Sequence, residues 1–120
     1  VAGARLGLLI CTELWALDRA RQYGKAGAEI LATPRATGRP TVDKWITGGR
    51  VAAIVSGAFS LSSNWTADEG GGDFGGAGWI VDPDGHVLAQ TSLEMPFQTL
   101  TIDLAAAEGA RKTYLRYALE

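Results

Sequence analysis

The chain has 120 residues and a net charge of −2 at pH 7, with acidic and basic residues interspersed. This length suits one domain with a real hydrophobic core, and the charge pattern excludes an electrostatic footprint for nucleic acid or an anionic membrane. The single cysteine excludes an internal disulfide and a thiolate-rich metal site. We expect no metal and no cofactor.

The sequence carries no membrane or targeting signal. No apolar run approaches the roughly 20 residues of a membrane span, and the first residues do not read as a signal peptide. One cysteine suits a reducing compartment, so we expect a cytoplasmic protein. The chain begins without Met and enters an apolar strand almost at once, which we interpret as a fragment or a processed piece.

The first third of the sequence alternates strand and helix patterns. Residues 5–11 are predicted as a strand, 14–26 as a helix that ends before Gly27, and 29–33 as a second strand that Pro34 stops. A strand, a helix and a strand in so short a span form a crossover, which favours parallel pairing.

The middle of the chain is predicted as loop, short helix and buried strand. Residues 35–40 are the loop, 41–49 the helix with Thr41 as its cap, and 51–55 the strand. A polar, glycine-rich loop follows over 62–78. Its run 70–76 lacks the Lys-Ser/Thr ending of a phosphate loop, so we expect a flexible loop over a site, or disorder.

A hairpin and a helix are predicted at the end of the chain. Residues 78–82 and 86–90 are strands joined by a Pro-Asp-Gly turn at 83–85. Alternating residues over 97–103 predict a last strand. Asp103 could cap a helix from 104 to the end.

Cys11 is the candidate nucleophile because it ends the apolar run 6–10, directly before the helical pattern. We predict it at the C-terminal end of a central strand. A thiol at such a junction has exposure, a positive helix end that favours thiolate, and backbone donors for an oxyanion. A lone cysteine that closes an apolar strand is more often a core residue, so both interpretations stand.

Four segments, in the same order along nearly the whole chain, resemble the C-terminal half of the carbon–nitrogen hydrolase (nitrilase) superfamily. They are 7–13 around the cysteine, then 19–34 with its Ala-Gly-Ala-Glu-Ile-Leu run and Thr-Pro ending, Trp45 and Arg50 before the run 51–56, and the hairpin 77–89.

This resemblance implies an α/β fold in which residues 1–120 form the C-terminal part of a hydrolase domain, as part of a four-layer α-β-β-α sandwich. It implies hydrolysis of a non-peptide C–N bond in a small amide, N-carbamoyl compound or nitrile, through a thioester on Cys11. The family's catalytic set is Glu, Lys and Cys in that chain order, and Thr12 matches the residue whose backbone N–H holds the oxyanion. We also expect a homo-oligomer.

The family's Glu and Lys have no matching position here, because the ten residues before Cys11 contain neither residue type. We therefore expect this chain alone to be inactive. Glu13 matches the acid just after the nucleophile, not the general base. It could tune the site, or cap the following helix as a favourable charge.

Three further residues are candidates for substrate binding. Trp15 could line the pocket or belong to the core. Arg35, where the family often has a small residue, could face a substrate carboxylate with its planar fork, or could be a solvated loop residue. Asn64, next to Trp65, could close the pocket or serve a turn. His86 is expected on the surface.

A non-catalytic α/β domain that binds a partner or ligand, with Cys11 as a core thiol, is the alternative. Titration of the free thiol distinguishes the two hypotheses, since an accessible thiol that ionises near neutral pH supports the hydrolase.

Overall fold

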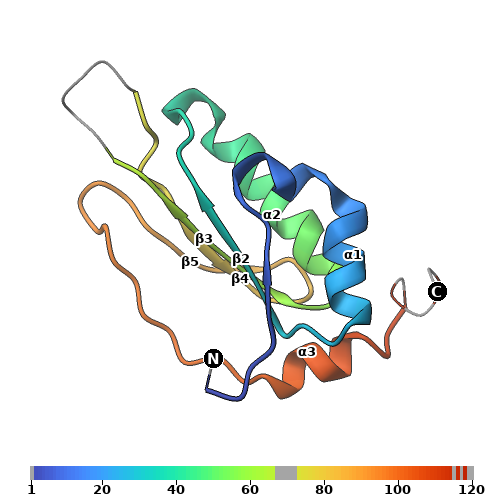
Figure 1. The fold of residues 1–120 in the computed structure, drawn as a ribbon. Helices are drawn as coiled ribbons and strands as arrows, with labels where there is room; N and C mark the ends of the chain where they lie inside the picture. The colour runs from blue at the N-terminus through green and yellow to red at the C-terminus, as the bar shows by residue number, and fades with distance from the viewer. Residues whose placement is uncertain (1, 67–72, 115, 117, 119–120) are drawn as a thin grey trace.

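The computed structural model describes residues 2–66, 73–114, 116 and 118, which form one sheet and its covering helices (Figure 1). In chain order the elements are β1 (Leu6–Leu8), the 3-10 helix η1 (Cys11–Trp15), α1 (Leu17–Lys25), β2 (Ile30–Arg35), the 3-10 helix η2 (Arg39–Thr41), α2 (Val42–Ser56), β3 (Phe59–Asn64), β4 (Trp79–Val81), β5 (Val87–Gln90) and α3 (Ala105–Ala110).

The sheet has five strands in the order β1-β2-β3-β4-β5. The first three strands are parallel, and β4 and β5 pair antiparallel. The predicted crossover from β1 through α1 to β2 is therefore confirmed. The predicted hairpin turn is also confirmed, since the Gly85 N–H donates to Asp82 O at 2.9 Å and Gly85 has φ +84°.

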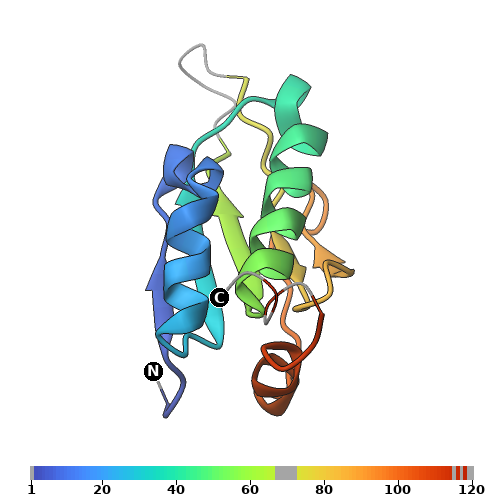
Figure 2. The same ribbon diagram turned by 90° about the vertical axis from the view of Figure 1, so that its right-hand side faces the viewer.

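Helices α1 and α2 both lie on one face of the sheet, as the two views show (Figures 1 and 2). Between them and the sheet, Leu14, Leu31 and Val81 are fully buried. Burial of each such side chain contributes about 1.5–3 kcal/mol relative to its exposure. Among the described residues no helix covers the opposite face, where Leu6 and Leu8 are 42% and 49% exposed. The described chain thus forms one helical layer and one sheet layer of the expected sandwich.

The prediction of a strand over residues 51–55 was wrong, because helix α2 continues through Ser56. Gly48 and Gly49 do not end this helix; both are buried against aromatic rings of neighbouring elements. The helix ends instead at Gly57, which has φ +68° in the left-handed conformation of a C-cap. Thr41 precedes α2 but makes no side-chain cap bond, since its hydroxyl donates to Gly38 O at 2.9 Å.

The prediction that Pro34 stops the second strand was also wrong, because β2 runs on to Arg35. The Leu9 N–H donates to Ala32 O at 3.0 Å, so the alternation of the strand turns the nitrogen of Pro34 toward β1 as well. Strand β1 has already ended at Leu8 on that side. The missing N–H of the proline therefore leaves no ladder bond unmade.

Other elements also differ from the sequence-based expectation. The strand predicted over residues 5–11 is shorter, since β1 ends at Leu8 and Cys11 already belongs to η1. The first predicted helix is split at Ala16 into η1 and α1, and its end before Gly27 (φ +88°) is confirmed. Residues 97–103 form no strand. The Asp103 carboxylate does accept the Ala105 N–H at 2.9 Å, but α3 ends at Ala110.

The predicted loop over 62–78 begins two residues later, since β3 extends to Asn64. The expectation of flexibility over 70–76 falls partly outside the described residues. Gly75 and Gly76 are described, and the Gly75 N–H donates to Thr37 O at 2.8 Å. None of the helices in the described part of the chain has the length and apolar character of a membrane span.

Candidate active site

Cys11 is the first residue of η1, and Leu9 and Ile10 connect it to the carboxyl end of β1 at Leu8. It has φ +50°, the left-handed conformation that non-glycine residues rarely adopt. Such a backbone costs roughly 1–2 kcal/mol and is concentrated at functional sites. The side chain is half-buried rather than buried. The expected junction is therefore confirmed, but β1 is an edge strand of the described sheet, so the predicted central strand was wrong.

Glu13 fixes the turn that begins at Cys11. Its Oε2 accepts the Ile10 N–H at 2.9 Å, while its own N–H donates to Ile10 O at 3.1 Å. Its other oxygen accepts a hydrogen bond from the Arg19 guanidinium. The structure thus shows the capping contacts that one interpretation of Glu13 expects. Thr12 is exposed, and its backbone N–H belongs to the first turn of η1, where helical amides have no partner within the helix.

Arg35 is the last residue of β2 and only 6% exposed, so the interpretation as a solvated loop residue was wrong. All three of its nitrogens that carry hydrogen donate to protein oxygens. Nε donates to Ser62 Oγ at 3.0 Å, Nη1 to Thr37 Oγ1, and Nη2 to Ala77 O. The guanidinium carbon lies 4.4 Å from the centre of the Trp79 ring. These contacts join β2, β3 and the segment before β4 at one point.

Burial lowers the pKa of Arg35 to about 10, and the nearby sulfur of Cys11 acts in the opposite direction. Burial lowers this pKa because an apolar environment disfavours the charged form, while a thiolate nearby favours it. At neutral pH the guanidinium therefore remains a cation. Arg35 and Cys11 thus lie close enough for their charges to interact, which their separation in the sequence does not indicate.

Trp15 is not a core residue, since it is 41% exposed. Its ring centre lies 5.4 Å from that of Trp45 on α2, at an interplanar angle of 58°. Trp45 in turn lies 5.8 Å from the guanidinium carbon of Arg35, measured to the ring centre. The aromatic pair thus connects η1, which carries Cys11, to the surroundings of Arg35.

Asn64 holds the segment after β2 in place. Its Oδ1 accepts the Thr37 N–H at 2.9 Å and its Nδ2 donates to Thr37 O at 3.1 Å. The neighbouring Trp65 is 57% exposed and packs against Phe74, with ring centres 4.7 Å apart. These are the contacts of a residue that shapes a loop at the carboxyl edge of the sheet.

Sequence reasoning missed Thr37 and Ser62, the hydroxyl partners of Arg35. Both follow from topology, since the carboxyl ends of the parallel strands β2 and β3 meet at one edge. The sequence offered no signal for them, because the boundaries of β3 were not recognised. His86, expected on the surface, is exposed, and its Nδ1 lies 3.0 Å from Asp82 Oδ2.

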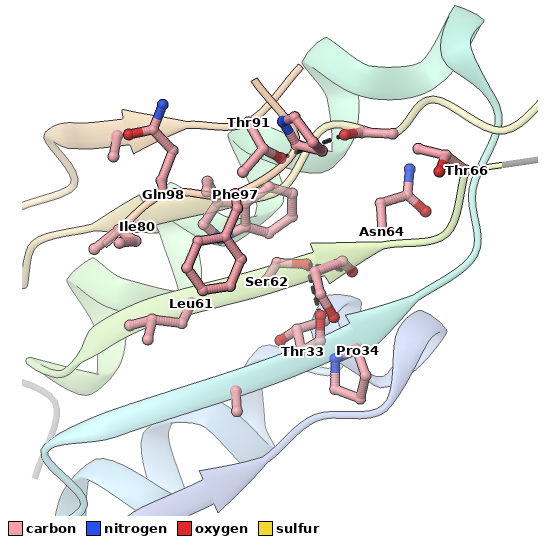
Figure 3. Close-up of a pocket in the computed structure, with 16 residues that line it drawn as sticks. Thr33, Pro34, Leu61, Ser62, Asn64, Thr66, Ile80, Thr91, Phe97 and Gln98 are labelled. Atoms are coloured by element: carbon pink, nitrogen blue, oxygen red, sulfur yellow. Dashed lines mark hydrogen bonds between the residues drawn. The ribbon is translucent and has the colours of Figure 1, made fainter. Parts of the chain in front are cut away.

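A cavity of about 460 Å³ lies on the face of the sheet that α1 and α2 leave uncovered. Its lining is mostly apolar, and Phe97 lies across the strands that carry Leu61 and Ile80 (Figure 3). Cys11 is not among its lining residues. Among the described residues, no three His, Cys, Asp or Glu side chains gather closely enough to hold a metal ion.

A family model described as carbon-nitrogen hydrolase matches residues 1–112. The glutamine-dependent NAD(+) synthetase of Rhodobacter capsulatus is 33% identical over 89 residues, which cover 71% of this chain and 16% of that protein. The 2-oxoglutaramate amidase of Paenarthrobacter nicotinovorans is 26% identical over 113 residues, which cover 94% and 38% of the two chains.

The fold agrees with these sequence matches. The crystal structure of a carbon-nitrogen hydrolase from Helicobacter pylori G27 superposes with a TM-score of 0.80 at 27% identity, covering 96% of this chain and 45% of that one. The chain therefore spans less than half the length of each of these relatives. With an α/β fold of the nitrilase type and a family match over nearly its whole length, the chain belongs to the carbon–nitrogen hydrolase family of the nitrilase superfamily.

Proposed function

We propose that this chain supplies the nucleophile of an enzyme that hydrolyses a non-peptide C–N bond in a small amide, N-carbamoyl compound or nitrile. The observation that carries this proposal is Cys11 at φ +50°, in the turn that follows strand β1 and begins η1, in a chain of this family. The amidase among its relatives favours an amide. The half-buried position of Cys11 speaks against a core thiol.

In the proposed reaction the thiolate of Cys11 attacks the carbonyl carbon of an amide. A C–S bond forms and the carbonyl electron pair moves to oxygen, where the Thr12 N–H donates to the oxyanion. As the carbonyl re-forms, the C–N bond breaks, and the nitrogen leaves with a proton from a general acid. Water then attacks the thioester and gives its proton to a base. The C–S bond breaks, which releases the acid and restores the thiolate.

The acid–base steps need groups that this chain does not supply at family positions. Both carboxylate oxygens of Glu13 already accept hydrogen bonds, one from the Ile10 N–H and the other from Arg19, so Glu13 is poorly suited as the base. We propose that the Glu and Lys implied by the resemblance come from outside residues 1–120.

The test is turnover of a panel of primary amides, N-carbamoyl compounds and nitriles by the enzyme that contains this chain. Cys11→Ala should abolish turnover and leave the circular dichroism spectrum unchanged. Mass spectrometry of the wild-type enzyme quenched during turnover should show an acyl adduct on Cys11. Thr12→Ala is the matched control, because it retains the backbone N–H and should keep activity within a few-fold. Turnover by Cys11→Ala would refute the assignment.

A further inference from the structure

Cys11 and Arg35 both lie beyond the last pair of β1 and β2, Cys11 as the first residue of η1 and Arg35 as the last residue of β2. Leu8 of β1 pairs with Ala32 of β2, and the two residues each lie three positions beyond this last pair. At the end of β2, the side chain of Arg35 lies on the helix-covered side of the sheet, where Leu31 and Thr33 are also buried. The turn at Cys11 folds η1 over that side, since Leu14 of η1 is fully buried in the same core.

The guanidinium of Arg35 is a buried cation whose described partners are all neutral. Its acceptors are two hydroxyls and one carbonyl, from Ser62, Thr37 and Ala77. Among the described residues no carboxylate pairs with it. Buried charges in proteins are normally paired with an opposite charge, because an isolated one is expensive to desolvate. The described group nearby that becomes an anion is the sulfur of Cys11.

We propose that Arg35 is a positioning residue whose fixed positive charge stabilises the anionic sulfur of Cys11. This inference rests on the proposed function, in which that sulfur is the nucleophile. Three hydrogen bonds and the face of Trp79 hold the guanidinium, so it does not need to reorganise when the thiolate forms. The surrounding low-dielectric interior strengthens the attraction relative to water.

A substrate carboxylate is the alternative anion that could pair with the Arg35 guanidinium. The geometry disfavours it, because Nε, Nη1 and Nη2 each already donate to a protein oxygen and the residue is 6% exposed. A ligand would have to displace these acceptors to form a fork-like pair with Arg35. The thiolate needs no such displacement, since it acts through the electric field.

The test is the rate of alkylation of Cys11, the sole cysteine, by neutral iodoacetamide as a function of pH. Arg35→Met should slow alkylation at pH 7 by about tenfold or more, with the pH midpoint about one unit higher, because the thiolate is the reacting species. Arg35→Lys should stay within about threefold of wild type, since it keeps the charge. The matched control is Arg50→Met, which removes a guanidinium bonded to Gly85 O and should leave the profile unchanged.

A measurement on the wild type covers the case in which Arg35→Met fails to fold. Anionic iodoacetate should react faster relative to iodoacetamide at Cys11 than it does with free N-acetylcysteine, and 1 M salt should reduce the difference. Equal ratios for the protein and the free thiol would overturn the proposal. It would also be overturned if folded Arg35→Met alkylated like wild type, with only the KM of carboxylate-bearing amides raised.

These readouts do not depend on turnover, so the two proposals can fail separately. An unchanged alkylation profile in Arg35→Met, together with loss of turnover in Cys11→Ala, would refute the role of Arg35 alone. A shifted profile together with turnover by Cys11→Ala would refute the nucleophile assignment and leave the electrostatic pair in place.

Discussion

Gly49 of α2 lies so close to the indole of Trp79 on β4 that a Cβ on Gly49 would come within 2.5 Å of the Trp79 Cε2. Gly48 has the same relationship with Trp15, whose Cη2 would be 2.8 Å away. The two glycines allow α2 to approach both the sheet and η1. The indole of Trp79 that packs against α2 is the same ring on whose face the Arg35 guanidinium lies.

Gly49→Ala should destabilise the protein, although alanine has the higher helix propensity. The propensity gain is about 1 kcal/mol, whereas the collision with a ring buried in the core costs typically 1–3 kcal/mol or more. We expect a net loss of about 1–2 kcal/mol in the free energy of urea unfolding. The control is Gly109→Ala in α3, where a Cβ would meet nothing within 4 Å. That variant should be neutral or slightly more stable; equal losses in both variants would contradict the packing argument.

The same glycines explain why the sequence was misread in the middle of the chain. Gly48 and Gly49 read as the end of a helix, and the apolar run after them as a strand, because short apolar runs do not distinguish the two. The need for glycine at these two positions becomes clear only in the tertiary structure, where α2 packs closely against Trp15 and Trp79. The crossover, the hairpin and the junction at Cys11 were predictable, since each depends on local periodicity and turn chemistry.

Arg35 shows why the site was less predictable than the fold. Loop arginines are usually solvated, and a break at Pro34 would have placed Arg35 in a loop. The strand continues because the nitrogen of Pro34 faces a side where β1 has ended. Burial of Arg35 then depends on Ser62 and Thr37, which are distant from each other in sequence. No local pattern encodes such a convergence.

Thr33→Val should stabilise the protein. The hydroxyl oxygen of Thr33 is buried without a hydrogen-bond partner among the described residues, and the side chain is 1% exposed. Valine has nearly the same shape and removes the desolvation cost, which is roughly 1–3 kcal/mol for an unsatisfied polar group. We expect a higher Tm in calorimetry. The control is Thr47→Val on the exposed side of α2, where the hydroxyl donates to Asp43 O and its loss should not stabilise.

The backbone at Cys11 predicts a difference between two substitutions that both remove the thiol. At φ +50° an alanine keeps the strain of a Cβ in the left-handed region, whereas glycine does not. Cys11→Gly should therefore be more stable than Cys11→Ala by roughly 0.5–1 kcal/mol, the difference being reduced by the greater freedom of glycine in the unfolded chain. Urea unfolding of the two variants measures it. A more stable alanine variant would contradict the strained turn.

Asp82 should make the hairpin turn sensitive to acid. Burial acts to raise the pKa of Asp82, but backbone hydrogen bonds from His86 and Asp84 and the contact with the His86 ring outweigh it and lower the pKa. A carboxylate with a lowered folded-state pKa stabilises the fold above its unfolded value of about 3.9, and this contribution is lost as pH falls through the folded value.

The expected outcome is a pH-dependent effect of Asp82→Ala. At pH 7 its Tm should lie below that of wild type, and the difference should shrink as the pH falls below about 4 and the wild-type carboxylate becomes protonated. Glu94→Ala, at an exposed position, is the control and should show a small difference at both pH values. A gap for Asp82→Ala that is constant with pH would show that the loss is one of shape rather than charge.

Residues 1–120 expressed alone should self-associate and show no measurable turnover. Leu6 and Leu8 are 42% and 49% exposed on the edge strand β1, and exposed apolar edges pair with other chains. Without the family's Lys and Glu, loss of one oxyanion donor costs ~10²–10³ in rate, and loss of the proton-transfer group about another 10²–10⁴. Because the apolar strand is exposed, light scattering should show that the mean mass of the particles rises with protein concentration. Leu8→Lys should reduce it, whereas Gln22→Lys, which adds the same charge on the helical side, should not. A compact monomer with measurable hydrolysis would mean that the catalytic base lies within this chain.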